Sequence, residues 1–301
     1  MAATFEDVGG LPDLLCRIFF DDFPQLKEHP ALVRKSDGGF NYTTTDLATL
    51  EHRLKTWQPD EIIYVTDGRQ QLHFQQVFAA FRKWHGESKT KLAHVWFGSI
   101  LGEDGKPFKT RSGETVKLAD LLDEAEERAF KIVSEKNPEL PEAQRKEIAR
   151  VVGLGAVKYA DLLPNRQSDY VFCWDKMLAL QGNTAPYLQY AYARIKSIFR
   201  KAESGNLKAE IILAAPEEIS LAKQLLNFGL TLEAVAEEYR PNFLCNYLFE
   251  LAGKFTAFYE NCPVLKADEA TRNSRLALCD LTARVLKQGL DALGIEVVEQ
   301  M

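Results

Sequence analysis

Apolar residues between positions 46 and 98 switch repeatedly between helical and strand-like spacing. Residues 46–55 carry leucines at i, i+3 and i+7, which predicts a helix with one buried face. Residues 61–66, EIIYVT, form a short apolar run with polar ends, as in a buried parallel strand. Residues 70–84 return to helical spacing, and residues 94–98 form an apolar strand that ends in glycine. This helix–strand–helix–strand order predicts a parallel α/β sheet.

Two shorter strands are predicted before this alternating region. They cover residues 17–23 and 31–35, and the turn at residues 36–39, Ser-Asp-Gly-Gly, closes the second. The segment 1–17 shows no pattern that predicts an element.

The spacing becomes helical throughout after position 117, and residues 159–165 are predicted to be a connector. A proline at position 186 suits the start of a long helix, where its missing N–H costs little. The predicted fold class is therefore α/β followed by all-α, with an unmatched segment 1–17, an α/β domain over residues 18–182 and a helical bundle over 183–301. The expected helices cover residues 118–135, 141–152, 186–203, 216–227, 231–238, 242–261 and 268–293.

Composition indicates a soluble globular protein with one large or two ordinary domains. The chain has 301 residues, of which 46% are hydrophobic and 27% charged. No apolar run approaches the roughly 20 residues that span a bilayer, and acids at positions 6, 7 and 13 argue against a secretory signal. The five cysteines are scattered without CxxC spacing, so we expect reduced thiols, no zinc site and a cytoplasmic location.

The net charge of −6 is mild evidence against a nucleic-acid binder, but the charge is uneven. Residues 190–202, YAYARIKSIFRKA, contain four cations and no acid. A local basic stripe can bind a phosphate backbone, although it is equally consistent with a solvated helix face. The tyrosines of this helix are expected to pack rather than to stack on bases. The candidate nucleic-acid-binding residues are Arg194, Lys196, Arg200 and Lys201.

The segment 102–118, GEDGKPFKTRSGETVKL, combines cations, hydroxyl side chains, glycines and a proline. Such a loop suits phosphate binding, and it lies between a predicted strand and a predicted helix, as expected for ATP chemistry on an α/β sheet. A solvated surface turn is the alternative interpretation. The residues that would contact phosphate are Lys106, Lys109 and Arg111.

Residues 108–113, FKTRSG, resemble the degenerate second signature loop of class I arginyl-tRNA synthetases, which reads KMSKS in most class I enzymes. The resemblance extends from residue 18 to the end of the chain, and it corresponds to the C-terminal half of such an enzyme. Residues 41–46, NYTTTD, resemble the family's tyrosine–threonine–aspartate element, and residues 68–73, GRQQLH, the next element. Residues 183–191, NTAPYLQYA, resemble the entry to the helical anticodon-binding domain.

The resemblance implies roles for individual residues. Tyr42 would pack on the guanidinium of the arginine substrate and Asp46 would pair with it, as a carboxylate and an aromatic face can. Without the resemblance, a core aromatic residue and a first-turn helix acid would be the simpler interpretation. Gln70 would help to hold arginine. The residues implied for ATP are His73, Phe97, Gly98, Lys109 and Arg111, with Phe97 and Gly98 seating the adenine through the backbone.

The implied reaction is that of an arginine–tRNA ligase, which converts arginine, ATP and tRNA(Arg) into arginyl-tRNA, AMP and pyrophosphate. Magnesium would enter with ATP, and neither a tightly bound metal nor a membrane partner is expected. The protein would be a cytoplasmic monomer unless a separate N-terminal half completes it.

One departure from the family leaves the function open. The first signature motif of class I synthetases, HIGH or a variant, has no counterpart, because the sequence contains no H-x-G-H. The N-terminal domain and the first half of the nucleotide fold are also unmatched. A partial or truncated ligase, a non-catalytic tRNA-binding remnant and one subunit of a split enzyme all remain possible. Retention of Tyr42, Asp46 and Gln70 argues against the remnant, because a pure tRNA binder has no use for an arginine pocket.

Overall fold

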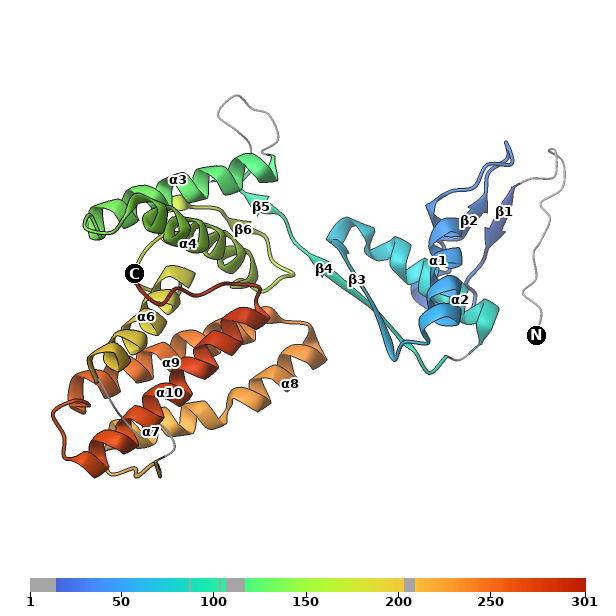
Figure 1. Ribbon diagram of the computed structural model, residues 1–301. Coiled ribbons are helices and arrows are strands. Elements are labelled where there is room, and N and C mark those ends of the chain that lie inside the picture. The colour runs from blue at the N-terminus through green and yellow to red at the C-terminus, as the bar shows by residue number, and fades with distance from the viewer. Residues whose placement is uncertain (1–14, 87, 103, 107–116, 203–208) are drawn as a thin grey trace. The chain divides into compact units, whose positions relative to one another are not determined.

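The computed structural model describes residues 15–86, 88–102, 104–106, 117–202 and 209–301 (Figure 1). The chain divides into two compact units, Met1–Gly98 and Ser99–Met301. This division falls earlier in the chain than the predicted domain boundary between residues 182 and 183. That domain boundary stays a prediction.

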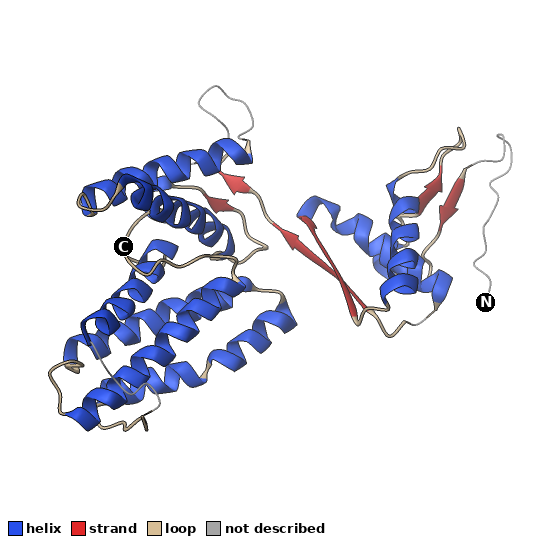
Figure 2. Cartoon of the chain, in the orientation of Figure 1, coloured by secondary structure: helices blue, strands red, loops and turns tan. Residues whose placement is uncertain are grey.

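The first unit contains the predicted alternation of helices and parallel strands. Its elements are α1 (Tyr42–Trp57), β3 (Glu61–Asp67), the 3-10 helix η2 (Gly68–Gln70), α2 (Gln71–His85) and β4 (Lys91–Phe97). The strands β3 and β4 pair in parallel, in register from Glu61 opposite Lys91 to Asp67 opposite Phe97 (Figure 2). The prediction of a parallel α/β arrangement is confirmed for these two strands.

The helix α1 begins four residues earlier than predicted. Its N-cap is Asn41, whose backbone is extended, so Tyr42 opens the helix and the threonines lie inside the first turn. Tyr42 and Asp46 are therefore four residues apart on one helix and share a face.

The core of the first unit lies between the helices and one face of the β3–β4 sheet. The ring of Tyr64 on β3 lies 4.7 Å from that of Phe74 and 5.8 Å from that of Phe78, both on α2. The guanidinium of Arg53 on α1 covers the same tyrosine ring at 5.2 Å. Both helices thus contact the same face of the sheet.

A separate antiparallel pair, β1 (Cys16–Ile18) with β2 (Ala31–Arg34), precedes these elements. The predicted strand over residues 17–23 is wrong beyond residue 18. Phe20 is fully buried, and Pro24 opens the 3-10 helix η1 (Pro24–Leu26), where its fixed φ favours a turn over a strand.

The second unit starts with a short parallel pair and a helical hairpin. The pair is β5 (Ile100–Leu101) with β6 (Tyr170–Val171), and the hairpin is α3 (Leu118–Lys136) with α4 (Glu142–Leu162), followed by α5 (Trp174–Met177). The prediction that the second of these helices ends at residue 152 is wrong. It continues for ten residues because its apolar face continues to Tyr159, which is fully buried and donates its hydroxyl to the backbone oxygen of Cys245 at 2.8 Å.

Close contact of α3 with α4 depends on Gly153. A Cβ at this position would lie 2.7 Å from the carbonyl oxygen of Ala125, which is backbone and cannot swing away. We expect Gly153→Ala to destabilise the second unit by about 2 kcal/mol, because overpacking of up to about 3 kcal/mol outweighs a helix-propensity gain of about 1 kcal/mol. Urea unfolding followed by circular dichroism measures this loss.

Gly253→Ala is the matched control, because a Cβ there, on the exposed face of α9 (Pro241–Asn261), would meet no atom within 4 Å. The control should raise stability by up to about 1 kcal/mol. Equal effects of the two substitutions would show that Gly153 is not a packing requirement.

The rest of the second unit is the predicted helical bundle. Its helices are α6 (Ala185–Ala202), α7 (Pro216–Leu226), α8 (Phe228–Glu238), α9 and α10 (Glu269–Ala292), close to the bounds predicted from the sequence. The core that they share includes Leu188, Ile195, Leu248, Phe255 and Leu286. The five cysteines are free thiols. Within the described ranges, we find no helix with both the length and the apolar character needed to cross a bilayer.

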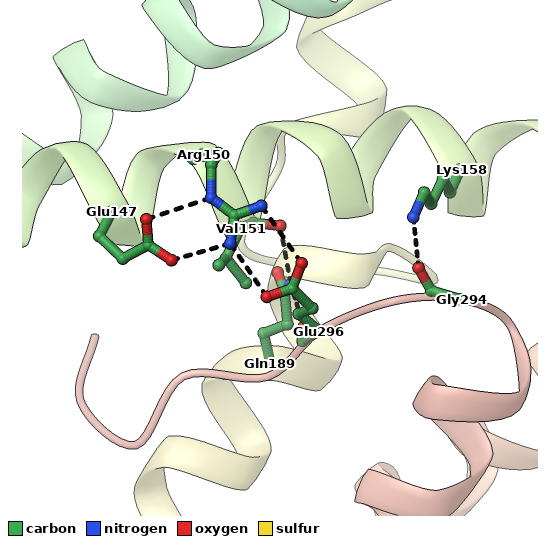
Figure 3. Close-up of polar contacts among 7 residues, drawn as sticks. All are labelled: Glu147, Arg150, Val151, Lys158, Gln189, Gly294 and Glu296. Atoms are coloured by element: carbon green, nitrogen blue, oxygen red, sulfur yellow. Dashed lines mark hydrogen bonds and ion pairs between the residues drawn. The ribbon is translucent and has the colours of Figure 1, made fainter.

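The C-terminal segment 294–301 connects the bundle to the hairpin (Figure 3). The guanidinium of Arg150 on α4 donates to both carboxylate oxygens of Glu296, at 3.2 and 2.9 Å. The buried amide of Gln189 on α6 donates to the backbone oxygen of Glu296 at 2.9 Å and to a backbone oxygen of α4 at 3.2 Å. Lys158 donates to the backbone oxygen of Gly294 at 2.5 Å. These contacts fix the segment to helices α4 and α6.

Candidate functional site

Three of the predicted site residues meet between α1 and α2. Nε2 of His73, in the first turn of α2, lies 2.7 Å from Oδ2 of Asp46 on α1. The ring of Tyr42 meets the His73 ring edge-on, with centroids 4.9 Å apart. Tyr42 is 69% exposed, whereas Asp46 and His73 are half-buried. The structure thus groups an open aromatic face with a fixed carboxylate.

The hydrogen bond between His73 and Asp46 orients the carboxylate. An ionised carboxylate only accepts hydrogen bonds, so Nε2 of His73 is the donor. The contact uses Oδ2 of Asp46, whose side chain is 30% exposed. An exposed guanidinium-sized cation can therefore reach a carboxylate oxygen and the Tyr42 ring together. This contact was not predicted, because the sequence assigned Asp46 to arginine and His73 to ATP.

A second group of predicted residues lies at the carboxyl ends of β3 and β4. Gln70 is exposed at the end of η2, immediately before α2. Gly68 approaches β4 so closely that a Cβ would lie 3.4 Å from the backbone oxygen of Phe97 and 3.0 Å from the Trp96 ring. The backbone at Phe97 and Gly98 is thus adjacent to the turn that carries Gln70. Because ligands of parallel sheets bind outside the carboxyl ends of the strands, this edge is a candidate nucleotide site.

The β3–α2 turn at this edge is held by an ion pair. Asp67 accepts hydrogen bonds from the backbone N–H of Arg69 and from its guanidinium, at 2.8 to 3.0 Å. The side-chain hydrogen bond from Arg69, followed by the backbone one, lowers the pKa of Asp67 below its usual value. Both groups are at the surface, so the pair fixes the turn rather than adding much stability.

The predicted phosphate-binding loop lies mostly outside the described residues. Lys106 is described and exposed, in a turn in which Gly102 donates its backbone N–H to the Lys106 oxygen at 2.8 Å. Lys109 and Arg111 lie outside the described residues. Their roles stay predictions.

The four predicted tRNA-binding cations lie on α6 and differ in their surroundings. Lys196 forms an ion pair of 2.9 Å with Glu299, and Arg200 donates to the backbone oxygen of Glu299 at 2.8 Å. Arg194 lies over the rings of Tyr190 and Tyr259, 4.9 and 5.6 Å from their centroids. Lys201 is exposed near the end of the helix. Lys196 and Arg200 are thus tied to the C-terminal segment, and Arg194 is stacked on aromatic rings.

A cavity of about 950 Å³ opens beside this stripe. It lies wholly in the second unit, between α6, the end of α9 and the C-terminal segment. Tyr192 is buried, as expected for a packing residue, but the expectation that Tyr190 packs is wrong, because its ring is exposed on the cavity wall. The cavity lining includes Asn137, Tyr190, Arg194, Arg200, Lys201, Tyr259, Lys266, Gln300 and Met301.

Sequence reasoning missed Tyr259, Lys266 and Met301 as wall residues. They come from the end of α9, the following loop and the C-terminus, so no local pattern unites them. A signal was present only for Lys266, the one cation in the short connection at residues 262–268 between two helices. Within the described ranges, no group of three or more His, Cys, Asp or Glu side chains is arranged to hold a metal ion.

Comparison with known proteins adds independent information. A family model described as tRNA synthetases class I (R), catalytic domain, matches residues 14–174, and one described as the DALR anticodon binding domain matches residues 188–301. Similar curated proteins include arginine–tRNA ligases of Chromobacterium violaceum and Hahella chejuensis, each 53% identical over 94% of this chain. The chain spans about half the length of the curated relatives it matches, because each alignment covers 50% of the relative.

Solved structures of arginyl-tRNA synthetases have a fold similar to that of this chain. Arginyl-tRNA synthetase from Plasmodium falciparum has a TM-score of 0.84 and 32% identity, over 99% of this chain and 50% of that one. The arginyl-tRNA synthetase of Thermus thermophilus has the same TM-score at 28% identity, over 99% of this chain and 56% of the other.

Proposed function

Because this chain belongs to the arginine branch of the class I tRNA synthetases, we propose that it supplies the C-terminal half of an arginine–tRNA ligase. In the proposed reaction, a carboxylate oxygen of arginine attacks the α-phosphorus of ATP and pyrophosphate leaves. The resulting arginyl-adenylate then passes its arginyl group to tRNA(Arg) and releases AMP. We place this activity in the cytoplasm.

The observation that carries the proposal is the cluster of Tyr42, Asp46 and His73. His73 holds the Asp46 carboxylate at 2.7 Å, and the Tyr42 ring, which is 69% exposed, meets the His73 ring edge-on. A guanidinium has a planar fork of donors that matches a carboxylate and a flat face that stacks on an aromatic ring. A lysine ammonium would satisfy the charge but not the fork, so the cluster favours arginine. Gln70, at the end of η2, is proposed to contact the same substrate.

ATP is proposed to lie at the carboxyl ends of β3 and β4. The backbone of Phe97 and Gly98 would exchange hydrogen bonds with the adenine. His73 lies in the first turn of α2, the helix that follows β3. The proposed contacts to the β- and γ-phosphates come from Lys106, Lys109 and Arg111. Magnesium would arrive with ATP as part of the substrate, where it neutralises phosphate charge. Catalysis then consists of positioning and charge stabilisation.

The tRNA is proposed to reach the cavity beside α6. Single-stranded bases of RNA are recognised by splaying them onto aromatic rings and arginine planes. Tyr190, Tyr259 and Arg194 supply such surfaces in the cavity wall, and Lys201 and Lys266 supply charge for the backbone. An unpaired anticodon base fits this chemistry better than a helical stem does, because the cavity is concave.

Arg194→Ala is expected to weaken binding of tRNA(Arg) roughly five- to thirty-fold, because it removes a stacking plane and a charge worth about 1–2 kcal/mol. Fluorescence anisotropy with labelled tRNA measures the change. Arg284→Ala is the control, since Arg284 is an exposed arginine of α10 paired with Asp280 and outside the cavity lining. If both variants lose a similar amount of tRNA affinity, the loss comes from the reduced positive charge of the protein and not from the position of Arg194 in the cavity.

Pyrophosphate exchange with arginine, ATP and tRNA(Arg) tests the proposed function. The alternative is a tRNA-binding protein without catalysis, which is favoured by the absence of H-x-G-H from the sequence. Exchange by this chain, alone or together with the other half of a relative, supports the ligase. No exchange in either sample, combined with tight tRNA binding, supports the alternative.

A further inference from the structure

The segment at residues 294–301 is fixed by polar contacts between α4 and α6 (Figure 3). The guanidinium of Arg150 on α4 bridges two carboxylates, Glu147 of its own helix at 2.8 Å and Glu296 of the segment at 2.9 Å. Gln189 on α6 is fully buried, and its amide donates hydrogen bonds to backbone oxygens of α4 and of Glu296, at 3.2 and 2.9 Å. Arg150 and Glu296 are 146 positions apart in the chain, so their ion pair is a tertiary contact that holds the segment.

Gly155 on α4 allows the segment to approach this closely. A Cβ at position 155 would lie 2.8 Å from Nε2 of Gln189 and 3.1 Å from a methyl carbon of Ile295. Ile295 is 1% exposed and belongs to the core of the bundle, which fixes the segment immediately before Glu296. The helices α4 and α6 and the segment therefore meet at one point, and the backbone at residues 295 and 296 has a defined position.

Beyond Glu296 the segment reaches the cavity beside α6. Gln300 and Met301 line this cavity, and Met301 also packs against the core of the α3–α4 hairpin. Arg150, Gln189 and Glu296 lie outside the lining of the cavity. They can therefore act on a molecule bound in the cavity only through the segment that they hold.

We propose that Arg150 and Gln189 are positioning residues for tRNA binding. They hold Glu296 and thereby place Gln300 and Met301 in the wall against which an unpaired base of the RNA lies. The ion pair of Arg150 with Glu296 is exposed and adds little to the stability of the fold, so its effect is on geometry. A segment that is already fixed loses little further conformational entropy when RNA binds, which raises the affinity. The inference rests on the proposed binding of tRNA to this cavity.

Charge reversal at position 150 tests the inference. Arg150→Glu faces Glu147 and Glu296 with a like charge and should release the segment. Fluorescence anisotropy compares the anticodon stem-loop of tRNA(Arg) with the same hairpin whose anticodon nucleotides are abasic. The preference of the unaltered chain for the intact hairpin should fall at least roughly three-fold in Arg150→Glu, because the wall that contacts the bases is no longer fixed. Binding of the abasic hairpin should change less.

Two further variants separate position from charge. Lys146→Glu is the matched control: it makes the same charge change on the same helix, at an exposed residue that pairs with Glu142, and it should keep the preference. Adding Glu296→Arg to Arg150→Glu should restore the preference, because the new guanidinium can bridge the carboxylates at positions 147 and 150.

A measurement without RNA follows the segment itself. The chain has three methionines, Met1, Met177 and Met301, so NMR with isotope-labelled methionine methyl groups gives few signals. The Met301 signal should sharpen and move towards the shift of a flexible methionine in Arg150→Glu, and it should return in the double variant. The buried Met177 should keep its signal in every variant, which shows that the hairpin stays folded.

Three results would overturn the inference alone: a Met301 signal that Arg150→Glu does not change, an undiminished preference for the intact hairpin in that variant, or an equal loss of preference in Lys146→Glu. Equal binding of the two hairpins by the unaltered chain, or no binding of either, has a different meaning. The cavity then does not recognise anticodon bases, and its proposed function fails together with the inference.

Discussion

Asp46→Asn is expected to weaken L-arginine binding by about ten- to hundred-fold. The substitution keeps the size of the side chain and removes its charge, so it takes away a charge-assisted hydrogen bond worth roughly 1.5–3 kcal/mol. It also replaces a pure acceptor by an amide that presents donors to the donors of a guanidinium. Titration calorimetry with L-arginine measures the change directly.

The matched control for this substitution is Asp60→Asn. Asp60 is an exposed acid of the same unit, just before β3, and its backbone oxygen accepts a hydrogen bond from the backbone N–H of Lys91. The control should bind arginine as the unaltered chain does. If both variants bind equally well, the carboxylate of Asp46 is not the guanidinium partner.

Glu218→Ala is expected to destabilise the helical bundle by about 3–5 kcal/mol. The carboxylate is 2% exposed, and it accepts from Arg275 Nε at 2.7 Å and from the backbone N–H groups of Ala214 and Ala215 at 2.8 and 2.9 Å. Removing it leaves a nearly buried guanidinium and two N–H groups without their acceptor, which is the costly way to break an internal ion pair. Urea unfolding at neutral pH measures the loss.

The same carboxylate makes the stability of the bundle depend on pH. Burial alone would raise the pKa of Glu218, but hydrogen bonds from Ala215, Arg275 and Ala214 together outweigh burial, so the pKa lies below its usual value of 4.5. A lowered pKa contributes stability that is complete above about pH 4.5 and is lost as the pH falls through the folded value. The variant should therefore lose less stability than the unaltered chain as the pH falls from about 4.5 through the folded value.

Glu127→Ala is the control for the ion pair itself. Glu127 pairs with Lys131 on the exposed side of α3, at 2.8 Å, with both side chains about two-thirds exposed. Its removal should cost no more than about 0.5 kcal/mol. A similarly small cost for Glu218→Ala would mean that the bundle does not rely on its internal carboxylate.

Most helices and the parallel strand pair could be predicted from apolar spacing alone. The exceptions have local causes. The glycines of α4 resemble an interruption in the sequence, yet Gly153 is needed because α3 packs against it. The strands β5 and β6 have two residues each, and strands of this length are too short to show an alternation of apolar and polar residues in the sequence. The start of α1 at Tyr42 was masked by three consecutive threonines, which favour caps as much as helix interiors.

The individual residues of the candidate site could be proposed from the family resemblance, but the contacts between them could not be predicted. Asp46 and His73 are 27 positions apart, and their hydrogen bond depends on how α1 packs beside α2. The cavity wall at α6 likewise combines Tyr190 with Tyr259 and Met301, which come together only through tertiary packing. Periodicity specifies which face of a helix is buried, but not which distant side chain meets it.

The most direct test of the account compares L-arginine with L-citrulline, whose neutral ureido group has nearly the same shape as a guanidinium. Calorimetric titration of the unaltered chain and of Asp46→Asn with both amino acids isolates the carboxylate–guanidinium contact. The unaltered chain should prefer arginine by at least roughly ten-fold, and the variant should lose most of this preference. Equal affinity of the unaltered chain for the two amino acids, or an undiminished preference in the variant, would contradict the assignment of Tyr42, Asp46 and His73 to an arginine site.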